Sequence, residues 1–300
     1  MRMNHSFDIA LSASFLFNQD FYLKNHTVRS LSFFDREIEP TLLCSFVETS
    51  TGNFVSGYRA PFGGIECTDI TQLNSFVLYI KEIFKSLGAA SITIRQAPEC
   101  YQPDVSVRIF EVLAKHGFTL NYSDVNQHIL VDPSVPFHSC IDDQKRRRLK
   151  TLKSKGARLE LLDHIDSDQW YELYIKSRVH KNFPVTISKE EYIHLSVKLP
   201  DRYQYAGVFV DGKLVANAIF VRVNSDVLYY FLAASDPEYA SLSPSVFILE
   251  VMYEIAQKQQ YSVLDLGISS VNGVINEGLH FFKKSLGAID SQKNTYELIY

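Results

Sequence analysis

The sequence predicts a mixed α/β protein made of two copies of one fold, and three observations lead to this class. The chain has 300 residues, which suits two domains of about 150 residues each, the usual size for a single hydrophobic core. Its second half alternates strand-like and helix-like segments in the order β-α-α-β-β-β-α-β-α-β. Much of that order recurs in the first half. We therefore expect an N-terminal domain at 1–135 and a C-terminal domain at 136–300, with Pro133 and Pro136 at the boundary.

The first half contains the weaker copy of this order. Strand patterns occur at about 28–37, 41–48, 53–58, 91–96 and 118–131, and helix patterns at about 69–87 and 104–116. The two halves match best where RIFEVLAKHGFTL is compared with GLHFFKKSLGAID. Each segment is an amphipathic helix, a glycine that ends it and a final strand, so Leu113 and Lys283 are equivalent when Gly117 and Gly287 are aligned.

The second half can be justified element by element. A strand is predicted at 156–163, followed by helices at about 168–179 and 188–199. The second helix begins at Ser188, which can form a capping box with Glu191, and Pro200 stops it. Three strands follow at 203–210, 213–223 and 226–234. The short Asp211-Gly212 and Asn224-Ser225 turns between them indicate an antiparallel meander.

A central helix follows the meander. Ser243 can cap this helix, Pro244 suits its first position, and its apolar face extends to about residue 260. A buried strand, YSVLDLG, comes next at 261–267. The half ends with a helix at about 276–286, closed by Gly287, and a strand at 291–300.

Composition and charge exclude several classes of protein. The net charge of -4 and the pI near 6.1 give no global field for nucleic acid, so DNA is not an expected partner. The four cysteines form no CxxC pair, which argues against a zinc site and predicts reduced thiols in a cytoplasmic protein. There is no HExxH motif, nucleophile elbow or Walker loop. We expect no membrane span, because no run of about 18 apolar residues occurs, and the N-terminus is too polar for a signal peptide.

One segment departs from this charge balance. Residues 145–158, KRRRLKTLKSKGAR, hold eight basic residues in fourteen and no acid. Such a run is most often a solvated helix face. It is also where the chain could contact the phosphates of a polyanion such as tRNA.

The ordered set of motifs resembles a known superfamily. The meander that leads into a central helix and a buried strand is similar to the GNAT acyltransferase fold. The stretches VLYYFLAASDPE, VLDLG and FKKSLG, with YRAPFGGIE and RRRLKTLKSKGARL, resemble the Fem-type peptidyltransferases, whose two tandem GNAT-like domains add amino acids to peptidoglycan precursors. The resemblance implies an acyl- or aminoacyl-transferase that acts on an amine acceptor, with no metal and no tightly bound cofactor.

The resemblance leaves the donor and the acceptor open. The donor would be aminoacyl-tRNA, as for Fem-type enzymes, or acyl-CoA, as for N-acetyltransferases of this fold, and the acceptor a small molecule or a peptidoglycan precursor. The family's threonine-plus-basic pattern is Ser177-Arg178-Val179-His180 here, so Arg178 or His180 could take the basic role. The phenylalanine of its FKxxFG pattern is Leu286, and the helical arm that some members insert has no counterpart. The alternative is a degenerate GNAT pair that only binds a ligand.

A GNAT-like C-terminal domain would open a slot where the strands before and after the central helix separate, here between 233–234 and 266–267. Donor phosphates can bind at the start of that helix, because free amides and the helix dipole favour an anion. The turn has no glycine and contains Asp236 and Glu238, which weakens a standard coenzyme A pyrophosphate site. Ser243 and Ser245 could donate hydrogen bonds to a donor, or only begin the helix.

Further binding residues are predicted around the slot and in the first half. Arg59 and the pair Gly63-Gly64 could cradle a phosphate, or form an ordinary turn. The loop at 268–275 is expected to line the slot, with Gly273 as its flexible position. Substrate contacts are assigned to Tyr230, Ser269, Asn272, Asn276 and Phe282. A slot plugged by Tyr229, Tyr230 or Phe281 would favour the ligand-binding alternative.

The remaining candidate is a lysine on the last helix. Leu279, Phe282 and Leu286 form the apolar stripe of this helix, with Phe282 as an anchor, and Lys283 is predicted at the partly exposed rim of the stripe. A rim lysine often only extends toward water. By the resemblance to Fem-type enzymes, Lys283 would assist acyl transfer, since an ammonium can stabilise the developing oxyanion.

Overall fold

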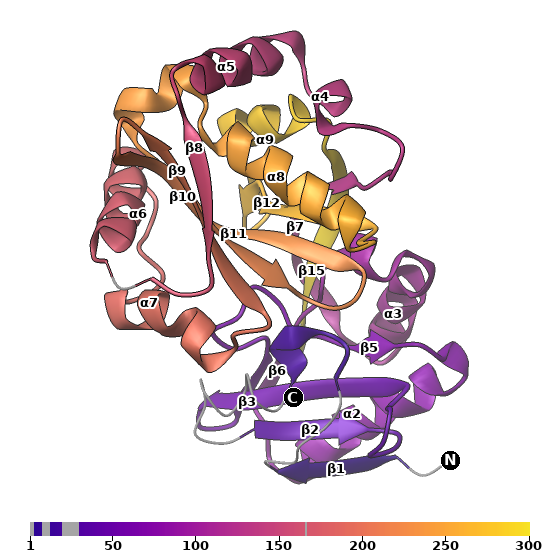
Figure 1. Cartoon of the computed structure of the whole chain (residues 1–300). Coiled ribbons are helices and arrows are strands. Elements are labelled where there is room, and N and C mark those ends of the chain that lie inside the picture. The colour runs from indigo at the N-terminus through magenta and orange to yellow at the C-terminus, as the bar shows by residue number, and fades with distance from the viewer. Residues whose placement is uncertain (1–2, 8–12, 20–29, 166) are drawn as a thin grey trace. The chain divides into compact units, whose positions relative to one another are not determined.

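The computed structural model describes residues 3–7, 13–19, 30–165 and 167–300 (Figure 1). It divides into two compact units. Unit 1 comprises Met1–Asn126, Ile268–Asn276 and Asp290–Tyr300, and unit 2 comprises Gln127–Gly267 and Glu277–Ile289. Two segments from the second half of the chain belong to unit 1, so the units interleave along the sequence. The division into tandem domains at 1–135 and 136–300 stays a prediction.

Unit 1 is a mixed sheet packed against two helices, α2 (Leu73–Ser86) and α3 (Pro103–Lys115). Its strands lie in the order β1-β2-β3-β4-β6-β15, in which β4 and β6 are parallel and the other neighbours antiparallel. Phe84 of α2 contacts Phe54 of β4 with ring centroids 4.6 Å apart, and Leu113 of α3 is fully buried in the same core. The remaining bounds are β1 Asn4–Phe7, β2 Ser30–Phe34, β3 Leu42–Ser50, β4 Asn53–Ser56, β5 Glu66–Cys67, β6 Ser91–Arg95 and β15 Ile289–Ile299, with short 3-10 helices at Leu16–Asn18, Ile70–Gln72 and Glu99–Tyr101.

Unit 2 is a mixed sheet with helices on both faces (Figure 1). Its strands lie in the order β7-β12-β11-β10-β9-β8. Alternate residues of β10 serve the two faces: Ala216 and Ala218 join the core beside α8, while Asn217 between them donates a hydrogen bond to the Trp170 carbonyl of α6 at 2.8 Å. The elements are β7 Thr119–Leu130, which passes from unit 1 into unit 2, β8 Arg158–Leu162, β9 Tyr203–Val210, β10 Lys213–Arg222, β11 Val227–Ser235, β12 Val263–Ile268, α4 Phe137–Cys140, α5 Asp143–Ser154, α6 Gln169–His180, α7 Lys189–Lys198, a 3-10 helix Pro237–Leu242, α8 Ser245–Lys258 and α9 Glu277–Lys284.

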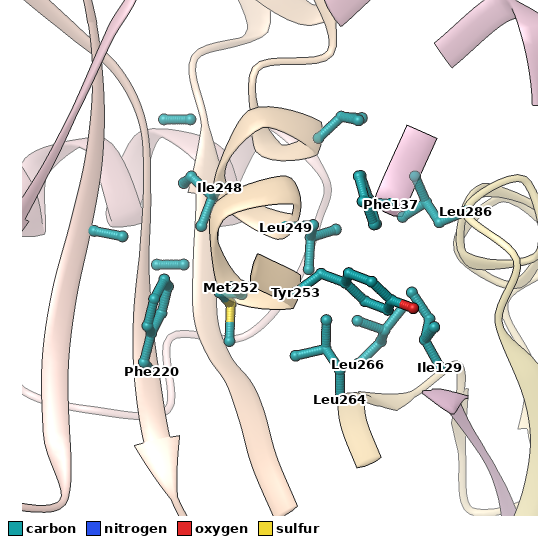
Figure 2. Close-up of a cluster of buried hydrophobic side chains, with 14 of the residues drawn as sticks. Ile129, Phe137, Phe220, Ile248, Leu249, Met252, Tyr253, Leu264, Leu266 and Leu286 are labelled. Carbon is teal, nitrogen blue, oxygen red and sulfur yellow. The ribbon is translucent and has the colours of Figure 1, made fainter. Parts of the chain in front are cut away.

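Helix α8 lies at the centre of the unit 2 core. Figure 2 shows Leu249, Met252 and Tyr253 of this helix among side chains of the sheet, including Leu264 and Leu266 of β12. The three α8 side chains are fully buried, and each such side chain stabilises the fold by about 1.5–3 kcal/mol relative to an exposed one. The strands on either side of α8 in the sequence, β11 and β12, are therefore held by a rigid support.

The predicted separation of these two strands is present. Strands β11 and β12 pair in parallel only from Val227↔Val263 to Tyr229↔Asp265. Beyond that point β11 continues along β10 as far as Ser235, and an irregularity in its register coincides with a positive φ of 47° at Leu232. The carboxyl ends of β11 and β12 thus lie apart, as the slot requires.

Most predicted elements are found, and two local predictions are wrong. The meander β9-β10-β11 and the capping box of α7 at Ser188 are confirmed. Helix α9 lies within two residues of its predicted bounds. Ser243 does not cap α8, because the N-cap position is Pro244 and no side chain bonds there. The segment expected to be a loop forms a hairpin, β13 (Ser270–Val271) with β14 (Val274–Ile275). Its two turn residues, Asn272 and Gly273, both have positive φ, because an Asn-Gly pair between apolar residues favours this tight turn.

Candidate functional site

Lys283 is the buried charge at the end of β12. Its side chain is only 5% exposed, and its Nζ donates a hydrogen bond to the Gly267 carbonyl at 2.7 Å. The prediction of a partly exposed rim position is therefore wrong. The helical wheel placed Lys283 beside the apolar stripe correctly, but the short helix α9 turns that edge toward the end of β12, which only the tertiary packing determines.

Asp265 and Gly267 shape the end of β12. Gly267 has a φ of 75°, a left-handed conformation that glycine adopts without strain. The Asp265 carboxylate, only 1% exposed, accepts a hydrogen bond from the Gly267 amide at 2.8 Å. A Cβ on Gly267 would lie 3.2 Å from the Tyr229 hydroxyl, so Tyr229 lies against this turn. The sequence did not predict the role of Asp265, although the motif Asp-Leu-Gly contained it.

Burial dominates the electrostatics of this cluster. It lowers the pKa of Lys283 to about 7, and the Asp265 carboxylate opposes that shift. Burial also raises the pKa of Tyr229, with a smaller contribution of the same sign from Asp265 and an opposing one from Arg178. Lys283 can thus change its charge near neutral pH, and as an ammonium it can donate a hydrogen bond to an anionic oxygen.

The structure distinguishes the two basic candidates of α6. Arg178 is half-buried, stacks over Tyr174 at 5.2 Å and Phe183 at 5.6 Å, and acts electrostatically on Tyr229. Its buried Nε has no hydrogen-bond partner among the residues that the structure describes. His180 is exposed on the same helix. Of the two, Arg178 is the residue placed near the Tyr229 side of the slot.

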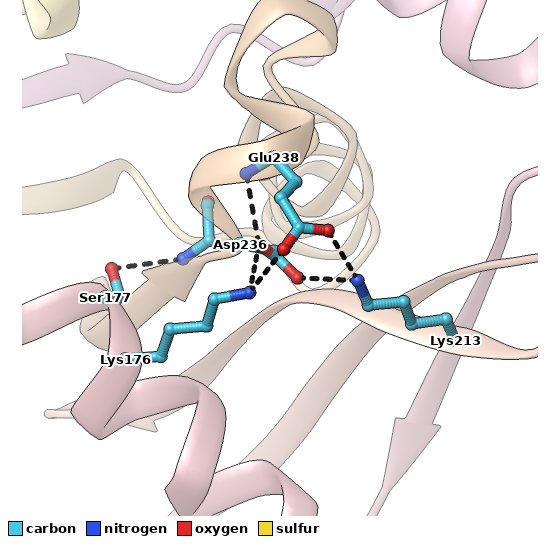
Figure 3. Close-up of polar contacts among 6 residues, drawn as sticks. Lys176, Ser177, Lys213, Asp236 and Glu238 are labelled. Atoms are coloured by element: carbon cyan, nitrogen blue, oxygen red, sulfur yellow. Dashed lines mark hydrogen bonds and ion pairs between the residues drawn. The ribbon is translucent and has the colours of Figure 1, made fainter. Parts of the chain in front are cut away.

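The turn that precedes the central helix holds an acidic clamp, in which Asp236 caps the 3-10 helix Pro237–Leu242 (Figure 3). Asp236, 2% exposed, pairs with Lys176 at 2.8 Å and with Lys213 at 3.0 Å. Glu238 pairs with the same two lysines at 3.1 Å. Burial alone would raise the pKa of Asp236, but hydrogen bonds and the lysines lower it overall. The two lysines balance the charge of the two carboxylates, and both are already paired within the clamp, so neither is available to a further anion such as a pyrophosphate.

The two predicted serines of this turn already have partners in the protein. The Ser243 hydroxyl accepts a hydrogen bond from Arg148 of α5 at 3.1 Å, and the residue has a positive φ of 48°. The Ser245 hydroxyl lies 2.9 Å from that of Ser235, and Tyr230 also bonds to Ser245. Their donation to a substrate stays a prediction. Tyr230 is turned toward this turn, and Phe281 is 71% exposed, so of the three proposed plugs Tyr229 is the one placed against the end of β12.

The basic helix α5 uses its two faces differently. Lys145 is buried with its Nζ 4.8 Å from the centre of the Phe282 ring, which confirms Phe282 as a packed residue of α9. Arg146 and Lys153 pair with Asp143 and Glu250. The cations left over on the exposed surface, without an ion pair among the described residues, include Arg147 and Lys150. An open depression of about 250 Å³ beside them is lined by His138, Arg146, Leu149, Lys150, Lys153 and Glu250.

The predicted phosphate loop belongs to unit 1, and its amides are already bonded. The Gly63 amide donates to the Arg95 carbonyl at 2.9 Å, and the Gly64 amide to the Ser56 hydroxyl at 2.5 Å. Arg59 is exposed with a positive φ of 53°. The amides of this pair therefore do not form the free cradle that the sequence suggested.

A buried carboxylate next to this loop was not among the predicted site residues. Glu66 accepts hydrogen bonds from Asn18 Nδ2 at 2.9 Å and from the Ser14 amide at 2.6 Å. Burial raises the pKa of Glu66 to about 7, although these bonds oppose the shift. The Gly-Gly-Ile-Glu motif contained this residue, but a lone glutamate gives no sign of burial.

The hairpin β13-β14 fixes the remaining predicted residues, which also belong to unit 1. Asp124 of β7 accepts hydrogen bonds from the Ser270 hydroxyl at 2.7 Å and from the Gly273 amide at 3.0 Å. The Ser269 amide donates to the Val125 carbonyl, and the Asn276 amide donates to the Ser269 carbonyl, each at 2.8 Å. Asn272 is exposed at the turn. Ser269, Asn272 and Asn276 thus belong to an ordered hairpin that Asp124 holds, and substrate contact by them stays a prediction.

Metal binding and membrane insertion have no support in the described residues. Within the described part of the chain, no three His, Cys, Asp or Glu side chains are grouped so that they could hold a metal ion. No helix of the described residues combines the length and the apolar character needed to cross a bilayer.

The separated strands, the central helix and the buried lysine agree with a family match. Residues 142–283 match the model of the acetyltransferase (GNAT) domain. No curated protein sequence matches the chain. The match identifies a GNAT-type acetyltransferase domain within these residues, a little under half of the chain.

Three solved structures have a fold similar to that of this chain. FemX has a TM-score of 0.72 at 14% identity, with 95% of this chain and 92% of that chain covered. A tandem GNAT protein from the clavulanic acid biosynthesis pathway has a TM-score of 0.52 at 9% identity, covering 97% and 90%. The C-terminal domain of a putative lysylphosphatidylglycerol synthetase from Agrobacterium fabrum has 0.57 at 13%, covering 86% and 81%. The chain therefore shares the fold of FemX, and the predicted class, α/β with two tandem GNAT-like domains, is confirmed.

Proposed function

We propose that the protein transfers an acyl or aminoacyl group to an amine acceptor and that Lys283 assists this transfer. The observation that carries the proposal is the buried Lys283 side chain at the end of β12, where β11 and β12 separate. The GNAT domain match and the fold likeness to FemX support it. Arg178, with a buried and unpartnered Nε on the Tyr229 side of the slot, is the best candidate for an acceptor or donor contact.

The reaction needs only groups of the substrates and one donor from the protein. The acceptor nitrogen attacks the carbonyl carbon of an ester or thioester, a C–N bond forms, and an electron pair moves onto the carbonyl oxygen. The oxyanion then collapses and the bond to the leaving group breaks. The proton lost by the nitrogen is transferred to the leaving oxygen or sulfur, which departs as a neutral alcohol or thiol. Lys283 stabilises the oxyanion by a hydrogen bond, which is strongest in a site shielded from water.

For the donor we propose an aminoacyl ester of tRNA. The acidic clamp of Asp236 and Glu238 stands where a coenzyme A pyrophosphate would be expected, and it already engages Lys176 and Lys213, so these cations are not available to that donor. The exposed cations of α5, Arg147 and Lys150, supply the complementary charge for an RNA backbone. Acyl-CoA remains the alternative donor, as in an N-acetyltransferase.

For the acceptor we propose an amine of a peptidoglycan precursor, with the reaction in the cytoplasm. The resemblance of the motifs to Fem-type peptidyltransferases supports this class of acceptor. A ligand-binding protein without activity is the second candidate, and the position of Tyr229 against Gly267 favours it.

The direct test supplies the purified protein with labelled aminoacyl-tRNA and labelled acetyl-CoA side by side, with an amine-bearing peptidoglycan precursor as acceptor. We expect transfer from the first donor only. Lys283→Ala should lower turnover about 100-fold or more. The neighbouring and exposed Lys284 is the matched control, and Lys284→Ala should stay close to the wild-type rate. Binding of a donor with no transfer would favour the ligand-binding candidate.

A second experiment tests the RNA interaction of α5 alone. Reversing Arg147 and Lys150 to glutamate should weaken tRNA binding and make it less sensitive to salt, by about one unit of slope for each phosphate that the helix no longer neutralises. Reversing two exposed lysines on other helices, Lys85 and Lys258, keeps the change in net charge the same. If both pairs of substitutions weaken tRNA binding equally, the exposed side of α5 is an ordinary solvated helix face and not an RNA-binding surface.

A further inference from the structure

The residue Gly267 is held by two ionisable side chains of opposite sign. Asp265 accepts a hydrogen bond from its amide at 2.8 Å, and Lys283 donates one to its carbonyl at 2.7 Å. Asp265 comes from β12 and Lys283 from α9, so the arrangement joins the end of the strand to the last turn of the helix. The left-handed turn at Gly267 is what directs its amide toward one of these side chains and its carbonyl toward the other.

Both side chains are almost fully buried, Asp265 at 1% and Lys283 at 5% exposure. Charges in such surroundings are tolerated only when opposite charges and hydrogen bonds compensate for the missing water. Tyr229 on the neighbouring strand β11 faces Asp265, and Arg178 of α6 acts on Tyr229. The carboxylate that acts on Lys283 is that of Asp265.

We propose that Asp265 is a positioning residue for the transfer: it holds the turn at Gly267 to which Lys283 is bonded, and it keeps the Lys283 side chain charged. The proposal rests on the proposed role of Lys283. Asp265 does not touch the reacting atoms in this arrangement, since it acts through Gly267 and Lys283.

The physical reason is that two opposing effects determine the pKa of Lys283. Burial lowers the pKa of Lys283 to about 7, and the Asp265 charge works against that shift. Without the negative charge, the desolvated amine would be neutral at neutral pH. A neutral amine is a weaker hydrogen-bond donor to an oxyanion than an ammonium, so the charge of Asp265 extends the pH range in which Lys283 can act.

The test replaces Asp265 by asparagine, which keeps an oxygen for the Gly267 amide and removes the charge. Lys283 is titrated by NMR with labelled lysine, and its signal is assigned with Lys283→Arg. In Asp265→Asn we expect the titration midpoint to fall by about one pH unit or more. Turnover should then fall more at pH 8 than at pH 6. Asp265→Glu, which keeps the charge, should titrate close to the wild type and serves if the asparagine variant folds poorly.

A matched control is available in the same unit. Asp236 is also a buried carboxylate, but its lysine partners are Lys176 and Lys213. Asp236→Asn should leave the titration of Lys283 unchanged. An unchanged midpoint in Asp265→Asn, or a decrease in turnover that is equal at every pH, would overturn the proposal. If the wild type transfers no label, the proposed function fails, whereas a shifted midpoint would still establish the link between Asp265 and Lys283.

Discussion

The two units place opposite chemistry at equivalent positions. In unit 1 the residue four positions before Gly117 is Leu113, which is fully buried in an apolar core. In unit 2 the residue four positions before Gly287 is Lys283, which is almost as well hidden from water but bonded to the Gly267 carbonyl. The same helix, glycine and strand thus support packing alone in one unit and a buried cation in the other.

Their glycine turns differ in the same way. Gly64 and Gly267 are both left-handed, and a side chain accepts a hydrogen bond from each amide. The turn of unit 1 is closed by neutral groups, Ser56 and Gln96, and the buried charge nearby is the acid Glu66. The difference teaches that two copies of one fold need not carry the same buried groups: the turn of unit 2 is bonded to Asp265 and Lys283, and the turn of unit 1 to neutral side chains.

The largest expected effect on stability comes from placing a lysine in unit 1 at the position equivalent to Lys283 of unit 2. Leu113→Lys would bury an ammonium in an apolar core, and we expect it to lower the free energy of unfolding by about 4 kcal/mol. Urea unfolding measures this change. Val107→Lys on the exposed face of the same helix is the control and should change stability by less than about 0.5 kcal/mol. If Leu113→Lys is nearly as stable as the wild type, the apolar core of unit 1 tolerates a buried cation and the two units do not differ in this respect.

A smaller effect separates the two glycine turns. A Cβ at Gly64 would lie 2.4 Å from the Gln96 side chain and 2.8 Å from its Cα, whereas a Cβ at Gly267 meets nothing closer than 3.2 Å. Both alanine variants also carry the left-handed backbone penalty of about 1–2 kcal/mol. In urea unfolding we expect Gly64→Ala to be destabilised by about 3 kcal/mol and Gly267→Ala by about 2 kcal/mol. Gly212→Ala, left-handed with open space around it, should show the backbone penalty alone.

The finest comparison is the pH dependence of stability. The pKa of Lys283 is lowered to about 7 in the folded chain, so between pH 7 and its unfolded value the unfolded state binds more protons and stability rises with pH. The pKa of Glu66 is raised to about 7, so between its unfolded value and pH 7 the folded state binds more protons and stability falls as pH rises. Each slope is at most about 1.4 kcal/mol per pH unit.

These slopes are measured by urea unfolding at several pH values against Lys283→Met and Glu66→Gln. The stability of the wild type minus that of Lys283→Met should increase from pH 7 to pH 9. The corresponding difference for Glu66→Gln should decrease from pH 5 to pH 7. A flat difference for either residue would show that it titrates at its ordinary value.

The sequence predicted the frame of the fold better than the chemistry of the site. Helices such as α2 and α8 could be predicted because a single apolar stripe, repeated over fourteen residues, determines both their type and their buried face. Lys283 is different, because α9 has eight residues and its buried edge depends on the end of β12. No periodic pattern reports such an arrangement.

Two other features were absent from the prediction for different reasons. The Asn272-Gly273 pair between valines is a local signal for a hairpin, and local rules would have sufficed to find it. The electrostatic link between Asp265 and Lys283 joins a strand and a helix that the hairpin β13-β14 separates in the sequence. Only the fold shows that the two residues share one turn.

The interleaving of the two units has a consequence for biosynthesis. Strand β6 (Ser91–Arg95) pairs with β4 on one side and with β15 on the other, and β15 is translated after residues 127–267 of unit 2. While the ribosome makes unit 2, β6 therefore remains an unpaired sheet edge, the kind of surface that recruits foreign strands. Most of the unit 2 core can form during this interval. The sheet of unit 1 is completed only after residues 290–300 have been synthesised.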